Sequence, residues 1–357
     1  MAYRIIRIAI IFAAALFLME GCLRTIDELT PNPDNSTDVI KFEVEPLMFI
    51  NDDATKAQLK EGTEFSTNDI ISVYGRHHTT SDDELIFNSV DVTKGSSGWS
   101  YAPVQSWNWQ SGSDYYDFIA VYPNSAASSR MNISGNIAVK TDFNMASDNY
   151  DLLCAAIRRS GNESNRGRVV PFSFQHMLSA VKVVIINDSD NTNFTVNSIS
   201  FKNLVVSGSL KTTLNALGEP DFMWINTERS SGTVRSWAPG SLVYANNNEG
   251  PHSYEKANPY DLMIPGPLNV SVDGSNNDDK MPQLNIQYTP TGGVLHDVPP
   301  IILKDIERED HTLITSWSPA TKYAYYITIR TDGGVLVNVI TTEWNTVNAE
   351  TPGLLID

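Results

Sequence analysis

The sequence predicts an all-β protein made of two tandem antiparallel β-sandwich domains. Three observations support this fold class. Short apolar runs with period-two alternation recur along the chain, polar turn residues separate them, and long amphipathic helical patterns are missing. The chain has 357 residues, which suits two domains better than one because a single hydrophobic core rarely grows to that size.

The composition is that of a folded, acidic protein. Hydrophobic residues make up 41% of the chain, and the formal net charge is -17. No basic stripe is present that could replace the counterions of a phosphate backbone, so nucleic acid is excluded as a partner. The negative charge favours solubility and indicates no particular ligand.

The N-terminus predicts an export signal. Arg4 and Arg7 precede a short apolar core over residues 8–19, which is too short to span a membrane as a helix. Gly21 and Cys22 follow that core and resemble a bacterial lipobox, although Glu20 stands where a small neutral residue is usual.

We therefore predict a signal peptide over residues 1–21 and a lipid, including palmitate, on Cys22. This lipid would anchor the chain to the outer membrane at the cell surface. An ordinary signal peptide with an incidental cysteine is the alternative. Residues 22–37 are rich in Pro, Asn and Ser and predict a tether.

The N-terminal sandwich is predicted over residues 38–165. Alternation of apolar and polar residues indicates a half-exposed strand over Val39–Val44, and Pro46 ends it. The other expected strands cover residues 70–74, 85–87, 90–92, 115–122, 137–139 and 152–157.

The C-terminal sandwich is predicted over residues 166–357. The apolar stretch 169–186 opens it as a long buried strand. A change of phase at residues 197–198 indicates a β-bulge, and Asp332-Gly-Gly334 indicates a hairpin turn. Further strands are expected over residues 194–196, 199–201, 208–214, 260–264, 284–288, 323–329 and 335–340.

The residue types that carry catalysis or bind metals form no convincing group. His77 and His78 are adjacent but lack a third ligand at metal spacing, so we expect exposed loop histidines. His176 is expected to be a core histidine with its polar atoms satisfied, and Cys154 a small buried hydrophobe.

The acidic loops and the known catalytic motifs lead to the same expectation. The segments 188–192 and 273–279 lack the glycine and the distal glutamate of an EF-hand, so polar turns explain them better than calcium binding. The chain has no G-x-S-x-G, P-loop or G-x-G-x-x-G motif. We predict no enzyme activity and no cofactor.

Three groups of motifs resemble the fimbrillin-like lipoproteins of Bacteroides-type bacteria. The first runs from Trp99-x-Tyr101-x-Pro103 to the aromatic strand that ends at Pro123. The second is Pro171-Phe-x-Phe-x-His176, continued by the motifs at residues 196–210. The third starts at Trp317-Ser-Pro and ends near Trp344. The resemblance extends over about residues 39 to 345.

This resemblance implies two transthyretin-like sandwiches and a role in type V fimbriae. In such subunits a surface protease removes an N-terminal segment, and a strand from a neighbouring subunit fills the groove. Here the removable strand would be Val39–Val44, and the donor strand would come from Thr341–Asp357. The apolar groove and unpaired edge left behind would both be satisfied by the incoming strand.

The sequence departs from the family pattern at the expected cleavage site. No arginine occurs between Arg24 and Arg76, so Lys56 and Lys60 are the candidate processing sites. An unprocessed anchor and a tip subunit therefore stay open as alternatives, and the tip subunit would act as an adhesin for a host protein or glycan.

A glycan-binding surface lipoprotein is the rival interpretation. A run of aromatic residues could form an exposed platform for stacking sugars, or it could alternate into the sandwich core. Its members are Trp99, Tyr101, Trp107, Trp109, Tyr115 and Tyr116. Their exposure distinguishes the two interpretations, because coplanar indoles on one solvent face would favour a glycan.

Overall fold

A computed structural model describes most of the chain after the predicted tether. The described residues are 39–45, 65–126, 129–133, 136–148, 150–161, 169–257, 260–308 and 310–343. Contacts divide the chain into Met1–Asp38 and Val39–Asp357, and all described residues belong to the second unit. The predictions on Cys22, Lys56 and Lys60, and on the donor segment beyond Glu343, lie outside the described residues.

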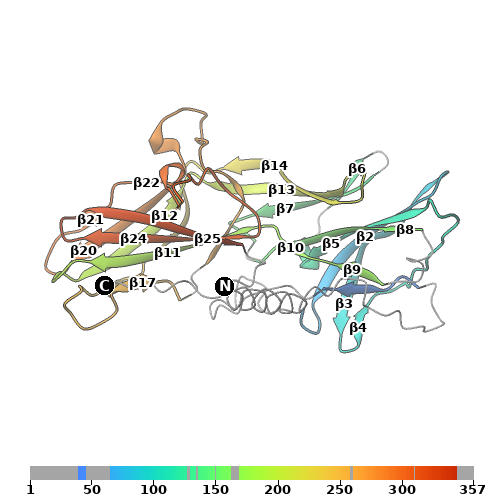
Figure 1. The fold of residues 1–357 in the computed structure, drawn as a ribbon, viewed down its shortest axis with the longest axis horizontal. Coiled ribbons are helices and arrows are strands. Elements are labelled where there is room, and N and C mark those ends of the chain that lie inside the picture. Colours follow the sequence, from blue (N-terminus) through green and yellow to red (C-terminus); the bar gives the residue numbers. More distant parts are fainter. Residues whose placement is uncertain are drawn as a thin grey trace, which may run out of the picture. The chain divides into compact units, whose positions relative to one another are not determined.

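The described part of the chain is all-β, as predicted (Figure 1). Its helical elements are short 3-10 turns, η2 (Asn124–Ala126), η4 (Asp278–Lys280) and η5 (Leu303–Asp305). No helix in this part is long and apolar enough to cross a membrane.

The N-terminal half contains a six-stranded antiparallel sheet in the order β10-β8-β5-β2-β3-β4. Its strands are β2 (Ile70–His78), β3 (Asp83–Gly95), β4 (Gly98–Ser100), β5 (Tyr115–Tyr122), β8 (Leu153–Ser160) and β10 (Gln175–His176). The bounds of β5 agree with the prediction. The two short strands expected within 85–92 are one strand, β3, whose register against β2 shifts near Gly75.

A short parallel pair lies beside that sheet. Strand β1 (Phe42–Val44) pairs with β9 (Val170–Phe172) over three residues, starting with Phe42 opposite Val170. The alternation expected for Val39–Val44 is confirmed, because Ile40 and Phe42 are buried while Lys41 and Glu43 are exposed.

A four-stranded antiparallel sheet combines strands from both sides of residue 165. Its order is β14-β13-β7-β6, with β6 (Ser129–Ile133), β7 (Asn136–Asn144), β13 (Val205–Leu214) and β14 (Pro220–Arg229). Strand β14 is not among the strands predicted from the sequence. Its side chains are mostly exposed because it forms the edge of the sheet, so the apolar alternation of a buried strand is weak.

The C-terminal half contains a five-stranded sheet with path β17-β11-β24-β25, to which β18 adds beside β11. These strands are β11 (Ser179–Asp188), β17 (Ser253–Glu255), β18 (Asp261–Met263), β24 (Thr321–Arg330) and β25 (Val335–Glu343). The predicted hairpin between β24 and β25 is confirmed, with Gly333 at a φ of 78° in its turn. Strands β11 and β24 are parallel, which the prediction of antiparallel sheets missed.

The second sheet of this half is built on β12 (Phe194–Lys202) and β20 (Gln283–Pro290). The remaining strands of the sheet are β15 (Thr233–Trp237), β16 (Ser241–Val243), β21 (His296–Asp297) and β22 (Ile301–Ile302). The predicted bulge is confirmed, because the register between β12 and β20 shifts between Val196 and Ser198. Strands β19 (Gly266–Pro267) and β23 (Ser316–Trp317) form a separate pair.

Two hydrophobic clusters hold these sheets together. The smaller is aromatic and contains Phe42, Phe87, Phe118 and Phe172 of the N-terminal half. The larger contains the buried residues of the C-terminal half together with residues of β5, β7 and β8. In it, Phe201 and Tyr325 come from opposite sheets with ring centroids 6.4 Å apart. Face-to-face packing of this kind is consistent with β-sandwich domains.

The stretch 169–186 links the two clusters instead of forming one strand. It breaks into β9, β10 and β11, of which the first two pair with β1 and β8 of the N-terminal half. Only β11 enters the C-terminal sheet. The division at residues 165 and 166 stays a prediction, and the strands on either side of it share sheets.

Candidate functional site

Strand β1 holds an aromatic side chain inside a socket made by four other rings. Phe42 is 5% exposed. Its ring centroid lies within 5.8 Å of the rings listed here, which we call the Phe42 socket: Phe87, Tyr101, Phe118 and Phe172. Burial of a phenylalanine side chain contributes about 1.5–3 kcal/mol, so Phe42 is a major attachment of this strand.

The socket is assembled from four separate parts of the chain. Phe87 comes from β3, Phe118 from β5 and Phe172 from β9, while Tyr101 directly follows β4. Gly75 on β2 makes room for two of these rings. A Cβ atom there would lie 2.8 Å from Phe87 and 2.9 Å from Phe118, so any larger residue would push the rings into the space of Phe42.

Backbone hydrogen bonds hold the strand on both edges. On one edge Val170 N–H donates to Lys41 O at 2.8 Å, and Glu45 N–H donates to Phe172 O at 3.0 Å. On the other edge Ile40 N–H donates to Gln105 O at 2.9 Å. Each such bond contributes about 0.5–1.5 kcal/mol, so the Phe42 side chain matches two or three of them.

A tyrosine hydroxyl completes the second edge. Tyr101 OH donates to Ile40 O at 2.7 Å and accepts from Gln105 N–H at 3.3 Å. Burial raises the pKa of Tyr101, so its hydroxyl stays a hydrogen-bond donor at neutral pH. The contact reaches the backbone of β1 and is independent of the side chain at position 40.

An open groove of about 450 Å³ runs along β1. Its lining includes Phe42 and Val44 of the strand, with Phe65 and Trp99 across from them. The Phe65 and Trp99 rings meet edge to face, with centroids 5.4 Å apart. Lys94 lies over the Trp99 ring at 5.7 Å. The groove therefore combines an apolar wall with charged groups near its opening.

Five of the six aromatic residues expected either to bind sugars or to enter the core lie in the aromatic cluster or pack against it, and Tyr115 lies outside that cluster. Trp107 is 7% exposed and Tyr116 1% exposed. The Trp107 and Trp109 rings stack at 5.1 Å, but both also meet the Tyr116 ring edge to face. Trp99, Tyr101 and Trp109 pack against the same aromatic cluster. Their packing matches the core interpretation.

His77 and His78 lie in strand β2 and are each 2% exposed, so the prediction of exposed loop histidines is wrong. The His77 ring stacks on Tyr116 with centroids 4.1 Å apart, and its Nε2 lies 3.7 Å from Asp114 Oδ2. Burial lowers the pKa of His77, although the nearby Asp114 carboxylate opposes that effect. The histidine therefore stays neutral at physiological pH.

His78 joins a second buried group on the same sheet. Its Nδ1 lies 2.7 Å from Asp83 Oδ1, and its Nε2 lies 3.4 Å from Asp117 Oδ2. Arg158 binds Asp117 with two hydrogen bonds of 2.7 and 2.8 Å and also donates to Ala216 O. Burial alone would raise the pKa of Asp117, but the hydrogen bonds from Arg158 and His78 hold it below its usual range.

The other sequence candidates have structural places. His176 is fully buried with its Nδ1 2.8 Å from Asp151 Oδ2. Cys154 is buried as expected, and burial raises its pKa to about 12, so its thiol is not a reactive nucleophile. Within the described ranges, no group of three or more His, Cys, Asp or Glu residues could hold a metal ion.

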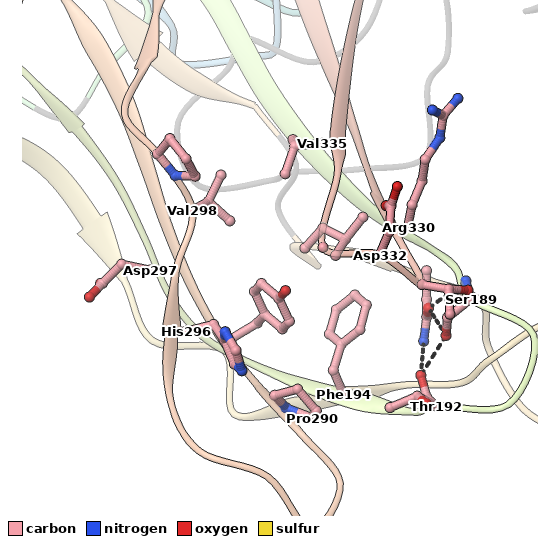
Figure 2. Close-up of a pocket in the computed structure, with 16 residues that line it drawn as sticks. Ser189, Thr192, Phe194, Pro290, His296, Asp297, Val298, Arg330, Asp332 and Val335 are labelled. Carbon is pink, nitrogen blue, oxygen red and sulfur yellow. Dashed lines mark hydrogen bonds between the residues drawn. The ribbon is translucent and has the colours of Figure 1, made fainter.

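A second concavity of about 370 Å³ lies where the hairpin turn of β24 and β25 meets the ends of β12 and β20 (Figure 2). Phe194 and Tyr288 line it with ring centroids 5.1 Å apart, and His296 stacks on Tyr288 at 5.4 Å. The Arg330 and Asp297 side chains point away from the Phe194 ring. The centre of this pocket is therefore mainly apolar.

Two features of the β1 site could not be predicted from the sequence. The pairing of β1 with β9 joins residues that are far apart in the chain. Gly75 has no turn signal around it, and its role emerges only from the rings that approach it. The strand at Val39–Val44, in contrast, was predicted from its alternation, and its removal was implied by the family resemblance.

The comparisons with known proteins agree with this architecture. The chain has no match among curated protein sequences. A fimbrial protein from Bacteroides vulgatus is similar in structure, with a TM-score of 0.52 at 14% identity over 77% of this chain and 92% of that one.

Two proteins of Porphyromonas gingivalis are also similar. A fimbrilin matches with a TM-score of 0.42 and 8% identity over 87% of this chain and 99% of its own. A C-terminally truncated tip fimbrial protein matches with a TM-score of 0.36 and 12% identity over 78% and 95%. Residues 55–344 match the model of the fimbrillin-like family, which covers most of the chain, and this protein therefore belongs to the fimbrillin-like family.

Proposed function

We propose that this protein is a subunit of a cell-surface fimbria, or an adhesin associated with one, that assembles by strand exchange at β1. The observation that carries the proposal is the attachment of β1. A strand paired over only three residues inserts one aromatic side chain into a socket of four rings. Loss of the strand would leave an apolar socket and an unpaired edge of β9, and an extended segment from another subunit could satisfy both.

The donor segment is proposed to be Thr341–Asp357. Its first residues belong to β25, which is the edge strand of the five-stranded sheet. A segment that continues from an edge strand can extend away from its own sheet without breaking interior pairs. Membership of the fimbrillin-like family supports the choice of another fimbrial subunit as partner.

Surface attachment and processing complete the proposal. Lipid on Cys22 would hold the precursor at the outer membrane, and cleavage after Lys56 or Lys60 would release β1 together with the anchor. Intact-mass measurement and N-terminal sequencing of protein from the native outer membrane test this part. A start at lipidated Cys22 would identify an anchored, unprocessed form, and a start after either lysine would identify a processed subunit.

Nothing in this role requires catalysis. The buried histidines and carboxylates of the N-terminal half are engaged with one another and with aromatic rings. We therefore assign the protein a structural or adhesive role without enzyme activity.

Deletion of Val39–Val44 tests strand exchange directly. Without these residues the Phe42 socket would be open, and we expect heat-resistant oligomers to form where the complete chain stays monomeric. Size-exclusion chromatography with light scattering measures the result. A truncated chain that stays monomeric and as stable as the complete chain would refute exchange at this edge.

A further inference from the structure

We propose that the β1 site selects its occupant by two separate features, a backbone clamp at Tyr101 and the Phe42 socket. The occupant would be an extended segment of another copy of this chain or of a related subunit. That segment would carry a large aromatic or aliphatic residue in the socket and an apolar residue two positions before it. This inference rests on the proposed strand exchange and adds the residues that set its register and specificity.

The clamp binds the backbone of residue 40. Tyr101 OH donates to Ile40 O, and the same hydroxyl accepts from Gln105 N–H. Gln105 O in turn accepts from Ile40 N–H. The two polar groups of residue 40 are thus fixed by one loop, whatever side chain that position carries. An occupant with its carbonyl at the same point keeps the 2.7 Å hydrogen bond, whereas the other acceptor of this hydroxyl, Gln105 O, lies at 3.4 Å.

The socket fixes which residue of the occupant faces it. Val39 forms an antiparallel bridge with Ser106, and position 42 falls in the socket three residues later. A slip of two residues returns a backbone carbonyl to Tyr101 and keeps the apolar face inward, but it moves a different side chain into the socket. Tyr101 therefore holds the backbone in either register, and the side chain at position 42 selects between the registers.

The socket determines which side chain fits at position 42. Phe172 stacks on the Phe42 ring at 5.4 Å with an interplanar angle of 17°, while Phe87 and Phe118 meet it edge to face. These three geometries fit a planar ring, and a small side chain would leave a cavity among them. In contrast, Glu43 is exposed, so the position next to Phe42 should carry no specificity.

Disulfide capture of a peptide tests both features on the full-length chain. The protein would carry Ser106→Cys, with Cys22→Ser to remove the other accessible thiol. The peptide would span residues 38–46 with Val39→Cys. Under a glutathione redox buffer, a peptide that displaces β1 is trapped by a disulfide to the thiol introduced into the protein, and intact mass spectrometry measures the trapped fraction.

The expected results separate the two features. Phe42→Ala in the peptide should lower capture on the order of 100-fold, because truncation of a buried phenylalanine leaves a cavity. Glu43→Ala in the peptide is the matched control and should not change capture. A peptide with Lys41→Cys and native Val39 tests the two-residue slip. Its trapped fraction should be low, because capture in that register places Val44 instead of Phe42 in the socket.

Tyr101→Phe in the protein isolates the clamp. It should weaken capture of every peptide about tenfold and retain both the preference for phenylalanine at position 42 and the difference between the Val39→Cys and Lys41→Cys peptides. Loss of capture confined to the peptides that carry Phe42 would instead show that Tyr101 acts through packing in the socket.

The outcomes distinguish failure of this inference from failure of the proposed strand exchange. Equal capture of the native and Phe42→Ala peptides would overturn the socket, and undiminished capture by Tyr101→Phe would overturn the clamp, while exchange itself would stand in both cases. Failure to capture even the native peptide at millimolar concentration would contradict a replaceable β1, and with it the proposed function.

Discussion

Two parallel strand pairs in this molecule differ in length and in how they are attached. Strand β1 pairs with β9 over three residues in a two-stranded sheet, whereas β11 pairs with β24 over nine residues inside a five-stranded sheet. Strand β24 is bonded on both edges, to β11 and to β25. In β1 the main attachment is one aromatic side chain in a socket.

This difference indicates how one fold can contain both a strand that stays in its sheet and a strand that another chain can replace. Cooperative burial over a long central pair ties β11 and β24 to the stability of the whole domain. A short edge pair adds little backbone energy, so a side-chain socket can hold it and another chain can compete for the same place.

The largest expected effect concerns the replaceable strand. Phe42→Ala should cost about 3–5 kcal/mol of β1 attachment, because the socket cannot close around the smaller residue. Native-state hydrogen exchange at Val170 N–H and Glu45 N–H measures this cost, since both amides bond across the β1–β9 pair.

The exposed neighbour provides the control for that experiment. Glu43→Ala should change the free energy of opening at the same amides by no more than about 0.5 kcal/mol. If Phe42→Ala lowered protection in β24 as much as in the β1–β9 pair, β1 would be part of the cooperative core and the contrast between the two pairs would be lost.

The permanent pair should respond globally. Ile327 of β24 is fully buried, and Ile327→Ala should lower the free energy of unfolding by about 2–5 kcal/mol in urea titrations. The half-buried neighbour Thr328 is the matched control, and Thr328→Ala should have a much smaller effect. Loss of β1 protection without a shift of the urea midpoint in Ile327→Ala would contradict this assignment.

An intermediate effect comes from the buried carboxylate of β5. Asp117→Asn should cost about 1.5–3 kcal/mol because it removes charge-assisted hydrogen bonds from Arg158. The pKa of Asp117 is lowered in the folded protein. Its stabilisation is therefore complete above the unfolded pKa of about 3.9 and is lost as pH falls through the lower folded pKa.

Acid unfolding curves of the native chain and of Asp117→Asn measure how stability depends on pH. Asp117→Asn should flatten the loss of stability below about pH 4, because asparagine does not titrate. A mutant that keeps the full acid transition would show that other carboxylates cause it.

The smallest expected effect is the titration of His77. Its pKa is lowered in the folded protein, so below the unfolded value of about 6.5 the unfolded chain binds a proton that the folded chain does not. The free energy of unfolding should therefore decline as pH falls from about 6.5 toward the folded pKa. His77→Gln should remove this slope, and urea titrations across that range would show a persistent slope if another group causes it.

Sequence alternation predicted the strands that bury one face, including β5, β12 with its bulge, and the β24–β25 hairpin. It missed β14, whose mostly exposed side chains lack that alternation. His77 and His78 were misplaced because their partners, Asp114 and Asp117, lie near or within a different strand. A polar pair at a strand end has the composition of a loop until such remote partners are known.

The site was predictable in part for the same reason. The removable strand followed from local alternation over Val39–Val44, together with the family resemblance. The socket did not, because Phe87, Tyr101, Phe118 and Phe172 converge only through tertiary pairing of β1 with β9. The clamp is likewise a contact between a side chain and a distant backbone carbonyl.

A reversible lock on β1 tests the central claim most directly. Val39 and Ser106 are bridge partners, so Val39→Cys with Ser106→Cys can form a disulfide across this edge. The background carries Cys22→Ser and also Lys41→Arg, so that the protease cannot cut between the disulfide and β1. The chain would be cut with a lysine-specific protease, and heat-resistant oligomers would be followed by electrophoresis. We predict that the oxidised chain stays monomeric and that reduction restores assembly. Oligomers forming equally well from the oxidised chain would contradict strand exchange at β1.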